Sequence, residues 1–270
     1  MQKRKFSPAD FLLRFYVYIL LFVMYAPILL LIVYSFTNTK IIGNWDGFSL
    51  HLYKALFRDK EIMQAFANTF LVAFSSAAIS TILGTLGAIG IFYSGKRSKA
   101  FMESLSNIPV MNAEIVTALS LTILFVFCGI KFNFIRLLIG HVVLTIPFVV
   151  LSVRPKLMQM DPNIYEAALD LGATPRKALR EVIIPEILPG VFSGFMLSVT
   201  LSLDDYIITA FTRDTAFQTL STYVYGVTSK KGTLPPSLRA LTTVITLIAL
   251  IILIIVNIKS SKEKEKAKEK

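Results

Sequence analysis

The sequence predicts an all-α protein that crosses a membrane six times. Of its 270 residues, 54% are hydrophobic and the mean hydropathy is +0.65, well above the range of a soluble domain. Six apolar stretches each provide at least the roughly 18 to 20 residues that a helix needs to cross about 30 Å of hydrocarbon. They are residues 11–36, 66–93, 105–128, 134–153, 187–211 and 241–258. We therefore expect one polytopic membrane domain over residues 1–258 and a charged tail at 259–270.

The first apolar stretch follows Lys3, Arg4 and Lys5, an arrangement that secretory signal peptides share. It is longer than the apolar region of such a signal, and no small-residue cleavage pattern follows it. We expect it to be a retained span whose basic flank helps to set the topology.

The positions of Lys and Arg predict the orientation of the spans. With six spans both termini share one side, and most of the 28 basic residues fall on that side. They are Lys3, Arg4, Lys5 and Arg14, then Lys96, Arg97 and Lys99, then Arg154, Lys156, Arg176, Lys177 and Arg180, and finally the six lysines between 259 and 270. Because basic connections remain in the cytoplasm, we expect both termini to be cytoplasmic.

The net charge of +11 then reflects topology and gives no indication of nucleic-acid binding. Membrane lipid is the expected surrounding of the spans. The tail at 259–270 is expected to be a solvated cytoplasmic extension. Contact of this tail with lipid headgroups is the weaker alternative, because its Glu residues dilute its positive charge.

No signature of a metal, disulfide or nucleotide site accompanies the spans. Cys128 is the single cysteine, His51 and His141 lie far apart, and no phosphate-binding loop ending in Gly-Lys-Ser or Gly-Lys-Thr occurs. Gly84, Gly87 and Gly90 fall inside the second span, where small residues favour close helix packing. We expect this chain to hold no cofactor or metal and to be no enzyme. If such a membrane protein drives transport, its energy would come from an ion gradient or from a partner.

The segment between the fourth and fifth spans, residues 161–185, is charged and interrupted by Gly and Pro. Asp161–Pro162 is a helix-start signal, and Gly172 suits the C′ position that follows a helix. Thr174–Pro175 repeats the start signal, and Pro185 is expected to end or kink the second helix. Two helices of about 10 residues, each about 15 Å long, are too short to span, so they would meet at a corner on the cytoplasmic side.

The first of these short helices has two unlike faces. Its apolar stripe, at i, i+3, i+4 and i+7, consists of Ile164, Ala167, Ala168 and Leu171. An acidic stripe with Glu166 and Asp170 lies beside it, and the second helix carries basic residues. An amphipathic connector resting on the bilayer is one reading, but an acidic stripe suits an anionic leaflet poorly. Docking to a cytosolic partner is the favoured reading.

These residues resemble the EAA motif of the membrane subunits of ABC importers. The motif positions are filled by Glu166, Ala167, Ala168, Gly172, Val182, Ile184 and Pro185. The resemblance implies a type I ABC importer permease fold, in which this loop docks on a cytosolic ATPase and passes nucleotide-driven movement to the spans. The coupling residues it implies are Glu166, Ala167, Ala168, Asp170, Gly172, Ala173 and Pro185. Leu179 departs from the pattern, because many members carry an aromatic residue there.

Further stretches resemble the C-type permease of bacterial spermidine/putrescine importers. They are "YAPILLLIVYSFTNTK", "WDGFSLHLY", "AEIVTALSL" and "LSVTLSLDDYIITAF". The resemblance implies a subunit of the bacterial plasma (inner) membrane that forms half of a polyamine pathway. The partners it implies are a second permease in a heterodimer, two copies of a cytosolic ABC ATPase and an extracellular or periplasmic solute-binding protein. ATP and Mg would be used by the ATPase.

Acidic residues inside two spans are the candidates for contact with a cationic cargo. A carboxylate at the membrane centre costs about 2.5 to 3.5 kcal/mol, so it usually faces a cavity or a partner. Glu114 is expected about ten residues, or about 15 Å, into the third span. Asp204 and Asp205 lie late in the fifth span, followed by Tyr206. Adjacent side chains on a helix point about 100° apart, so we expect one acid, Asp204, to face the pathway.

Other readings of these acids stay open at this point. Either could be a structural acid at a subunit interface, and the second aspartate could be held by a backbone group or by Ser202 or Thr209. An ion-coupled secondary transporter could use Glu114 and Asp204 as cation sites without an ATPase. A permease of the same class could also carry another cargo. An inorganic anion fits the paired acids poorly, whereas a ferric ion is compatible with their charge.

Overall fold

Every regular element of the computed structural model is a helix within the residues it describes, which are 8–39, 43–131, 133–161, 163–214, 216–231 and 235–268. Side chains are described over these ranges between residues 15 and 251, except at 133 and 231, and also at Ile254. The expected all-α class is confirmed. Residues 3–5 and the side chains of Arg14 and of the tail at 259–270, on which the expected orientation partly rests, lie outside the described part.

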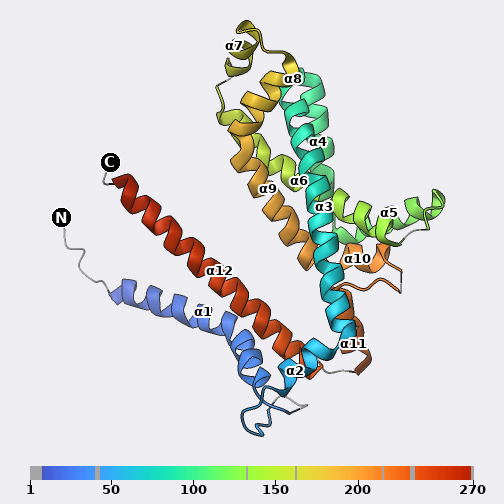
Figure 1. The fold of residues 1–270 in the computed structure, drawn as a ribbon, viewed down its shortest axis with the longest axis vertical. Coiled ribbons are helices and arrows are strands. Elements are labelled where there is room, and N and C mark those ends of the chain that lie inside the picture. Colours follow the sequence, from blue (N-terminus) through green and yellow to red (C-terminus); the bar gives the residue numbers. More distant parts are fainter. Residues whose placement is uncertain are drawn as a thin grey trace. The chain divides into compact units, whose positions relative to one another are not determined.

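The chain divides into two compact units, one formed by residues 1–63 with 226–270 and the other by residues 64–225. The first unit is built on the long helices α1 (Pro8–Ser35) and α12 (Pro236–Lys268), which pack against each other (Figure 1). The short helix α2 (His51–Arg58) packs on α12. Two helices, α3 (Lys60–Tyr93) and α11 (Leu220–Lys231), run from one unit into the other.

Polar contacts fix the loop that follows α1 in the first unit. The hydroxyls of Ser35 and Tyr53 lie 2.8 Å apart, which joins the end of α1 to α2. The guanidinium of Arg239 donates a hydrogen bond to the carbonyl oxygen of Thr39 at 3.1 Å, and the Arg239 residue is buried. The start of α12 is therefore tied to the chain that leaves α1.

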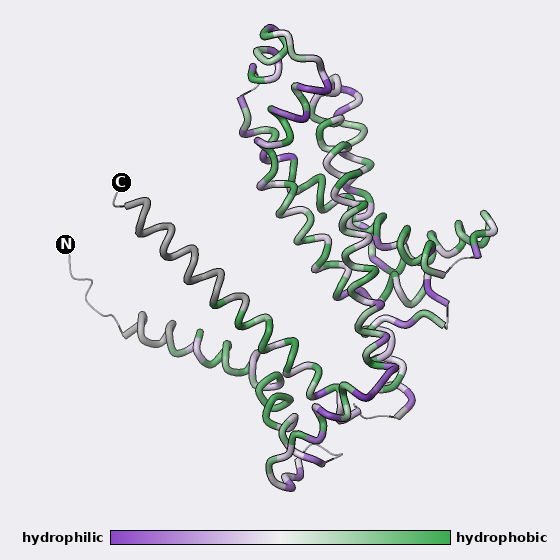
Figure 2. The backbone as a smooth tube through the Cα atoms, viewed as in Figure 1, coloured by the Kyte–Doolittle hydropathy of each residue, from purple (hydrophilic) through white to green (hydrophobic). Residues whose placement is uncertain are grey.

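The second unit contains the remaining helices. In chain order they are α4 (Lys96–Met111), α5 (Glu114–Phe127), α6 (Asn133–Gln159), α7 (Ile164–Asp170), α8 (Pro175–Ala178), the π turn η1 (Leu179–Ile183), α9 (Ile184–Asp204) and α10 (Ile207–Thr212). The closest association is between α6 and α9, and α4 also packs on α6. Hydrophobic residues run along most of the length of α3, α6 and α9 (Figure 2).

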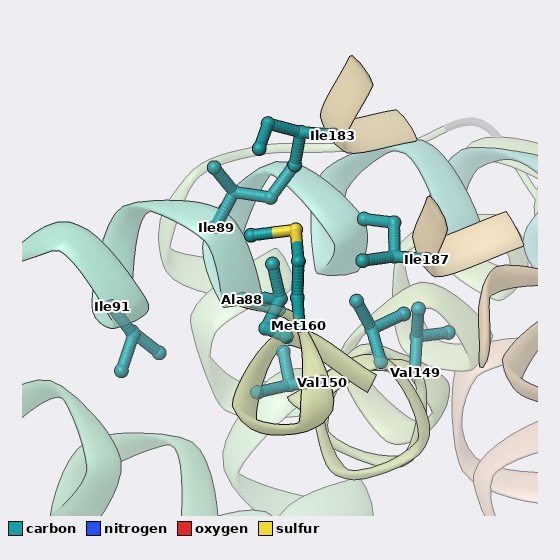
Figure 3. Close-up of a cluster of buried hydrophobic side chains, with 10 residues drawn as sticks. Ala88, Ile89, Ile91, Val149, Val150, Met160, Ile183 and Ile187 are labelled. Atoms are coloured by element: carbon teal, nitrogen blue, oxygen red, sulfur yellow. The ribbon is translucent and has the colours of Figure 1, made fainter. Parts of the chain in front are cut away.

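Val149 of α6 packs against the backbones of two neighbouring helices. A Cβ atom added at Gly84 of α3 would lie 2.7 Å from Cβ of Val149, and one added at Gly194 of α9 would lie 3.2 Å from its Cα. The absence of side chains at these glycines therefore lets three helices approach closely, as small residues do in membrane bundles. Val149 belongs to a buried cluster that also contains Met160 and Ile187 (Figure 3).

Gly84→Ala is expected to destabilise the second unit, because the added methyl group overlaps Val149 in a packed core. Overpacking of this kind costs about 1 to 3 kcal/mol. The midpoint of thermal unfolding in detergent should fall by several degrees. Gly90→Ala is the matched control on the same helix, since nothing lies within 4 Å of a Cβ added there. An equal loss of stability in both variants would contradict the packing argument.

Four helices of the described part are long and apolar enough to cross a membrane, namely 15–35, 60–93, 134–159 and 175–204. The helices α4 and α5 pass the same test only together, and they are bent by 105° at the break between them. The expected sixth span at 241–258 lies on α12, where a shorter apolar helix is described over Pro236–Ile251. Most side chains beyond residue 251 lie outside the described part.

Two of the expected spans differ from single continuous helices. The stretch 105–128 is interrupted at Asn112 and Ala113, both of which have extended backbone (ψ 147° and 133°), so no helical hydrogen-bond ladder runs through it. The stretch 187–211 is interrupted after Asp204, because Asp205 is also extended (ψ 129°). Broken helices within membrane proteins occur where neighbouring helices or side chains satisfy the freed backbone groups.

Candidate functional site

The expected coupling loop begins with α7, whose end has the geometry that its sequence indicates. Gly172 has a φ of +84°, a left-handed conformation that glycine adopts without strain. Its N–H donates to the carbonyl of Leu169 at 2.8 Å, and the N–H of Ala173 donates to that of Ala168 at 3.1 Å. These paired bonds satisfy the last carbonyls of the helix and turn the chain sharply.

The second helix of the loop differs from the expected short one. It begins as expected, with the Thr174 hydroxyl accepting from the N–H of Lys177, but α8, η1 and α9 then form one unbroken helix from Pro175 to Asp204. Pro185 does not end it, because the π turn at 179–183 lies immediately before. A wider turn moves the preceding carbonyl away from the proline ring and removes the need for its missing N–H.

Apolar contacts hold this loop against the second unit. Ile183 lies close to Ile89 of α3 in a fully buried position (Figure 3). The rings of Tyr93 and Tyr165 lie 5.3 Å apart. A pocket of about 390 Å³ between them is lined by Ile89, Tyr93, Tyr165, Pro175, Arg176 and Leu179. Figure 1 shows α7 and α8 at the end of the unit where α3 meets α4.

The outer surface of the loop carries most of the expected coupling residues. Glu166, Ala167 and Asp170 are exposed on α7, while Ala168 is half-buried. Leu171, which the helical pattern assigned to the apolar stripe, is 89% exposed at the corner. An acidic stripe and an exposed leucine therefore lie together on the outer surface of the loop.

At the other end of α9, the two adjacent aspartates have different surroundings. Asp204 ends α9 and is exposed. Asp205 lies between α9 and α10, and its carboxylate accepts hydrogen bonds from the N–H groups of Ile208 (3.1 Å) and Thr209 (2.8 Å) and from the Thr209 hydroxyl (2.8 Å). The Asp205 side chain is 2% exposed. It caps α10 and is the aspartate of the pair that Thr209 holds.

A buried histidine extends this cap into a network. Nδ1 of His141 lies 2.7 Å from the Ser202 hydroxyl, and its Nε2 lies 2.9 Å from the Thr209 hydroxyl and 3.6 Å from Oδ2 of Asp205. Ser202 in turn lies 3.2 Å from the hydroxyl of Ser76 on α3. Four helices therefore meet around the break after Asp204.

The structure brings Tyr206 together with a residue that the sequence did not indicate. The rings of Tyr206 and Tyr225 of α11 have centroids 4.6 Å apart, and Tyr225 is 57% exposed. No spacing rule links these residues, since they are brought together only by the fold. His141 was equally unassigned, although an ionisable residue inside an apolar stretch is itself a signal of function.

Glu114 lies at a corner rather than deep within a straight span. It is the first residue of α5 after the 105° bend, and it is exposed. Ala118, one turn later on the same face, packs against Ile208 of α10, and the Thr122 hydroxyl donates to the carbonyl of Phe211. Glu114 thus belongs to the helix that supports α10. The described residues contain no group of three His, Cys, Asp or Glu side chains arranged to hold a metal.

Comparison with known proteins identifies the family. Residues 1–259 match the model of the binding-protein-dependent transport system inner membrane component. The chain is 34% identical over 222 residues to the spermidine/putrescine transport system permease protein PotC of Escherichia coli K12, covering 82% of this chain and 83% of PotC. It is 33% identical over 232 residues to the putrescine transport system permease protein PotI of the same strain, covering 82% and 81%.

A solved structure shares the fold. A chain of a bacterial ABC transporter involved in the import of the acidic polysaccharide alginate matches with a TM-score of 0.71 and 16% identity, over 95% of this chain and 99% of that one. Permeases of ABC importers work in the inner membrane with ATPase and binding-protein partners. The chain belongs to the family of inner membrane components of binding-protein-dependent transport systems, and it is a transport subunit rather than an enzyme.

Proposed function

We propose that this chain forms half of the membrane pathway of an ATP-driven importer of polyamines, the class that includes spermidine and putrescine. The similarity to permeases named for these cations carries the proposal. The end of α9 supports it, because an exposed Asp204 carboxylate stands two residues before Tyr206, whose ring contacts that of Tyr225. Carboxylates bind ammonium groups, and aromatic faces attract cations and contact alkyl chains.

The other half of the pathway is a second, different permease subunit. Two copies of a cytosolic ABC ATPase bind below it and use ATP and Mg, and a solute-binding protein delivers the cargo from outside. Both termini of this chain face the cytoplasm of a bacterial plasma membrane, and membrane lipid surrounds its spans. The basic residues at 96–99, 154–156 and 176–180 lie in the first turn of α4, the last turns of α6 and the segment α8–η1, at the loop end of the second unit, which supports this orientation.

In this mechanism, closure of the ATPase pair on ATP moves α7. The movement enters α9 through the buried contacts of Ile183 and Ile187, since α8, η1 and α9 are one helix. The movement reaches Asp204 at the far end of α9, where the membrane pathway opens outward to accept cargo. Glu114 stands on the helix that supports α10 and offers a second carboxylate along the route.

Uptake into vesicles containing the chain with all its co-purifying subunits tests the cargo. ATP supplied on the side of the vesicle membrane that holds the ATPase should drive accumulation of labelled spermidine or putrescine. An ion-coupled carrier would instead respond to uncouplers and need no ATP. ATP-driven uptake of ferric ion or an inorganic anion, with no uptake of either polyamine, would overturn the cargo assignment.

Glu166→Lys is expected to weaken retention of the ATPase on the membrane, because it reverses the charge of the exposed acidic stripe on α7. Loss of a charge-assisted contact and its replacement by repulsion should lower co-purification of the ATPase by about ten-fold, equivalent to about 1.4 kcal/mol. Glu181→Lys is the matched control, since that acid is also exposed but lies on η1 beside Lys177. Equal retention in both variants would contradict docking through α7.

A further inference from the structure

We propose that His141 is a positioning residue for cargo passage: through Ser202, Thr209 and Asp205 it fixes the break between α9 and α10, and thereby the direction of the cargo-facing groups on either side. The inference rests on the proposed function, because it concerns the same Asp204 and Tyr206. Its distinct content is that the buried aspartate of the pair, together with the histidine, acts by placement and does not contact cargo.

The hydrogen atoms of the network define a single direction. The Thr209 hydroxyl has one hydrogen, which it donates to Oδ2 of Asp205 at 2.8 Å. Its oxygen must therefore accept the bond from Nε2 of His141 at 2.9 Å, so Nε2 carries a hydrogen. An imidazole that carries its single hydrogen on Nε2 accepts at Nδ1 from the Ser202 hydroxyl, which lies 2.7 Å away. The chain of donors runs from Ser202 through His141 and Thr209 to Asp205.

This series of hydrogen bonds joins α9 to α10 across the break between them. Ser202 belongs to the last turn of α9, whereas Thr209 belongs to α10. A helix of six residues is not stable alone, so α10 depends on its surroundings. Those surroundings are close: a Cβ added at Gly140 of α6 would lie 2.8 Å from Ile208. His141, the next residue of α6, is 1% exposed and supplies the polar part of the same contact.

The directions of the side chains on either side of Asp205 depend on the position of Asp205. Asp204 and Tyr206 are its direct neighbours, so a fixed Asp205 restricts the directions available to both. The carbonyl of Asp205 also accepts from the hydroxyl of Ser221 on α11 at 2.8 Å. Because α11 carries Tyr225, Asp205 aligns the helix that supplies the second tyrosine of this ring pair.

The energetics of the buried polar network favour a role beyond stability. Unpaired polar groups in an apolar interior are strongly destabilising, so loss of any one member of the network destabilises the fold by leaving its partners unpaired. An apolar packing of the same volume would avoid that risk. What the polar network adds is direction: each bond has a fixed length and angle, and each joins a different element to the break.

Thr209→Val and Thr209→Ser test the inference in the complete complex. Valine has nearly the shape of threonine but has no hydroxyl, whereas serine keeps it. Each is combined with Cys128→Ser and Tyr206→Cys, and labelling of the thiol introduced by Tyr206→Cys with a cationic thiol reagent is followed on this chain. Thr209→Val should raise the labelling rate by about ten-fold, the ratio that loss of one hydrogen bond of about 1.4 kcal/mol produces. Thr209→Ser should leave the rate within about two-fold of the parent.

Uptake is measured in parallel with Tyr206 and Cys128 intact. The maximal rate of labelled spermidine uptake should fall in Thr209→Val and in His141→Leu, and recover in Thr209→Ser and in His141→Gln, which keeps a donor and an acceptor. A thiol introduced at Leu171, at the other end of the same unit, should label at an unchanged rate in all variants.

The outcomes separate this inference from the cargo assignment. If the labelling rate changes as expected but the parent complex carries no polyamine, the cargo assignment fails and the positioning role stands. If polyamine is carried and Thr209→Val leaves labelling and uptake unchanged, the positioning role is overturned. It is also overturned if Thr209→Val and Thr209→Ser behave alike, or if Thr209→Val prevents assembly, since the hydroxyl would then serve folding alone.

Discussion

Gly172→Val should abolish most ATP-driven uptake while leaving the complex in the membrane. The φ of +84° at this residue places a β-branched side chain in a strained conformation, at a cost of about 1 to 2 kcal/mol or more. The strain is released by opening the two bonds that end α7, which changes the direction of the helix that bears Glu166. Uptake in vesicles should fall by about ten-fold or more, as a shift of that size in a conformational equilibrium requires.

Gly172→Asn is the control for this prediction, because asparagine tolerates the left-handed conformation better than most other non-glycine residues. Space is no factor, since nothing lies within 4 Å of a Cβ added at this position. ATPase activity should persist in Gly172→Val without a matching rate of uptake. Normal uptake in Gly172→Val would show that the geometry of this corner is irrelevant to coupling.

Asp204→Asn should lower polyamine uptake by about ten-fold or more and leave assembly intact, because a charge-assisted contact contributes about 1.5 to 3 kcal/mol and each 1.4 kcal/mol corresponds to ten-fold. The exposed carboxylate has room for an amide of the same shape. The measurement is the initial rate of labelled spermidine uptake per mole of complex, with the amount of complex checked by co-purification.

Two further variants give Asp204→Asn its meaning. Glu186→Gln removes an exposed charge from the same helix at the loop end and should leave uptake unchanged. Asp205→Asn should instead reduce the amount of folded chain, because an amide cannot accept all three of the bonds that the carboxylate receives from Ile208 and Thr209. An assembly defect in Asp204→Asn would assign that residue a structural role.

The loop between α6 and α9 is the most predictable part of the fold, because its turns depend on local chemistry. Gly172 and Thr174 act through their own backbone and nearest neighbours, so their conformations follow from residue type. The α-helical class follows equally from the length of the apolar stretches. Pro185 is different, because a π turn one residue before it changes the steric rule that makes proline a helix breaker.

The breaks within the expected spans could not be read from hydropathy. Asn112 and Ala113 stand among apolar residues, and hydropathy reports burial without reporting helix direction. The 100° separation expected between Asp204 and Asp205 assumed a continuous helix, whereas the backbone turns at Asp205. The contact of Tyr225 with Tyr206 and the partners of His141 depend on segments that are distant in the sequence, which no local pattern encodes.

The unbroken helix from Pro175 to Asp204 has a mechanical consequence. Its 30 residues make a lever about 45 Å long. Because the helix is about 45 Å long, a tilt of about 10° about one end moves the opposite end by about 8 Å. In the proposed mechanism a small rotation at the ATPase end is thereby amplified into a displacement of several ångströms at Asp204, and the π turn at 179–183, like Pro189, is a place along the helix where such a rotation is partly absorbed.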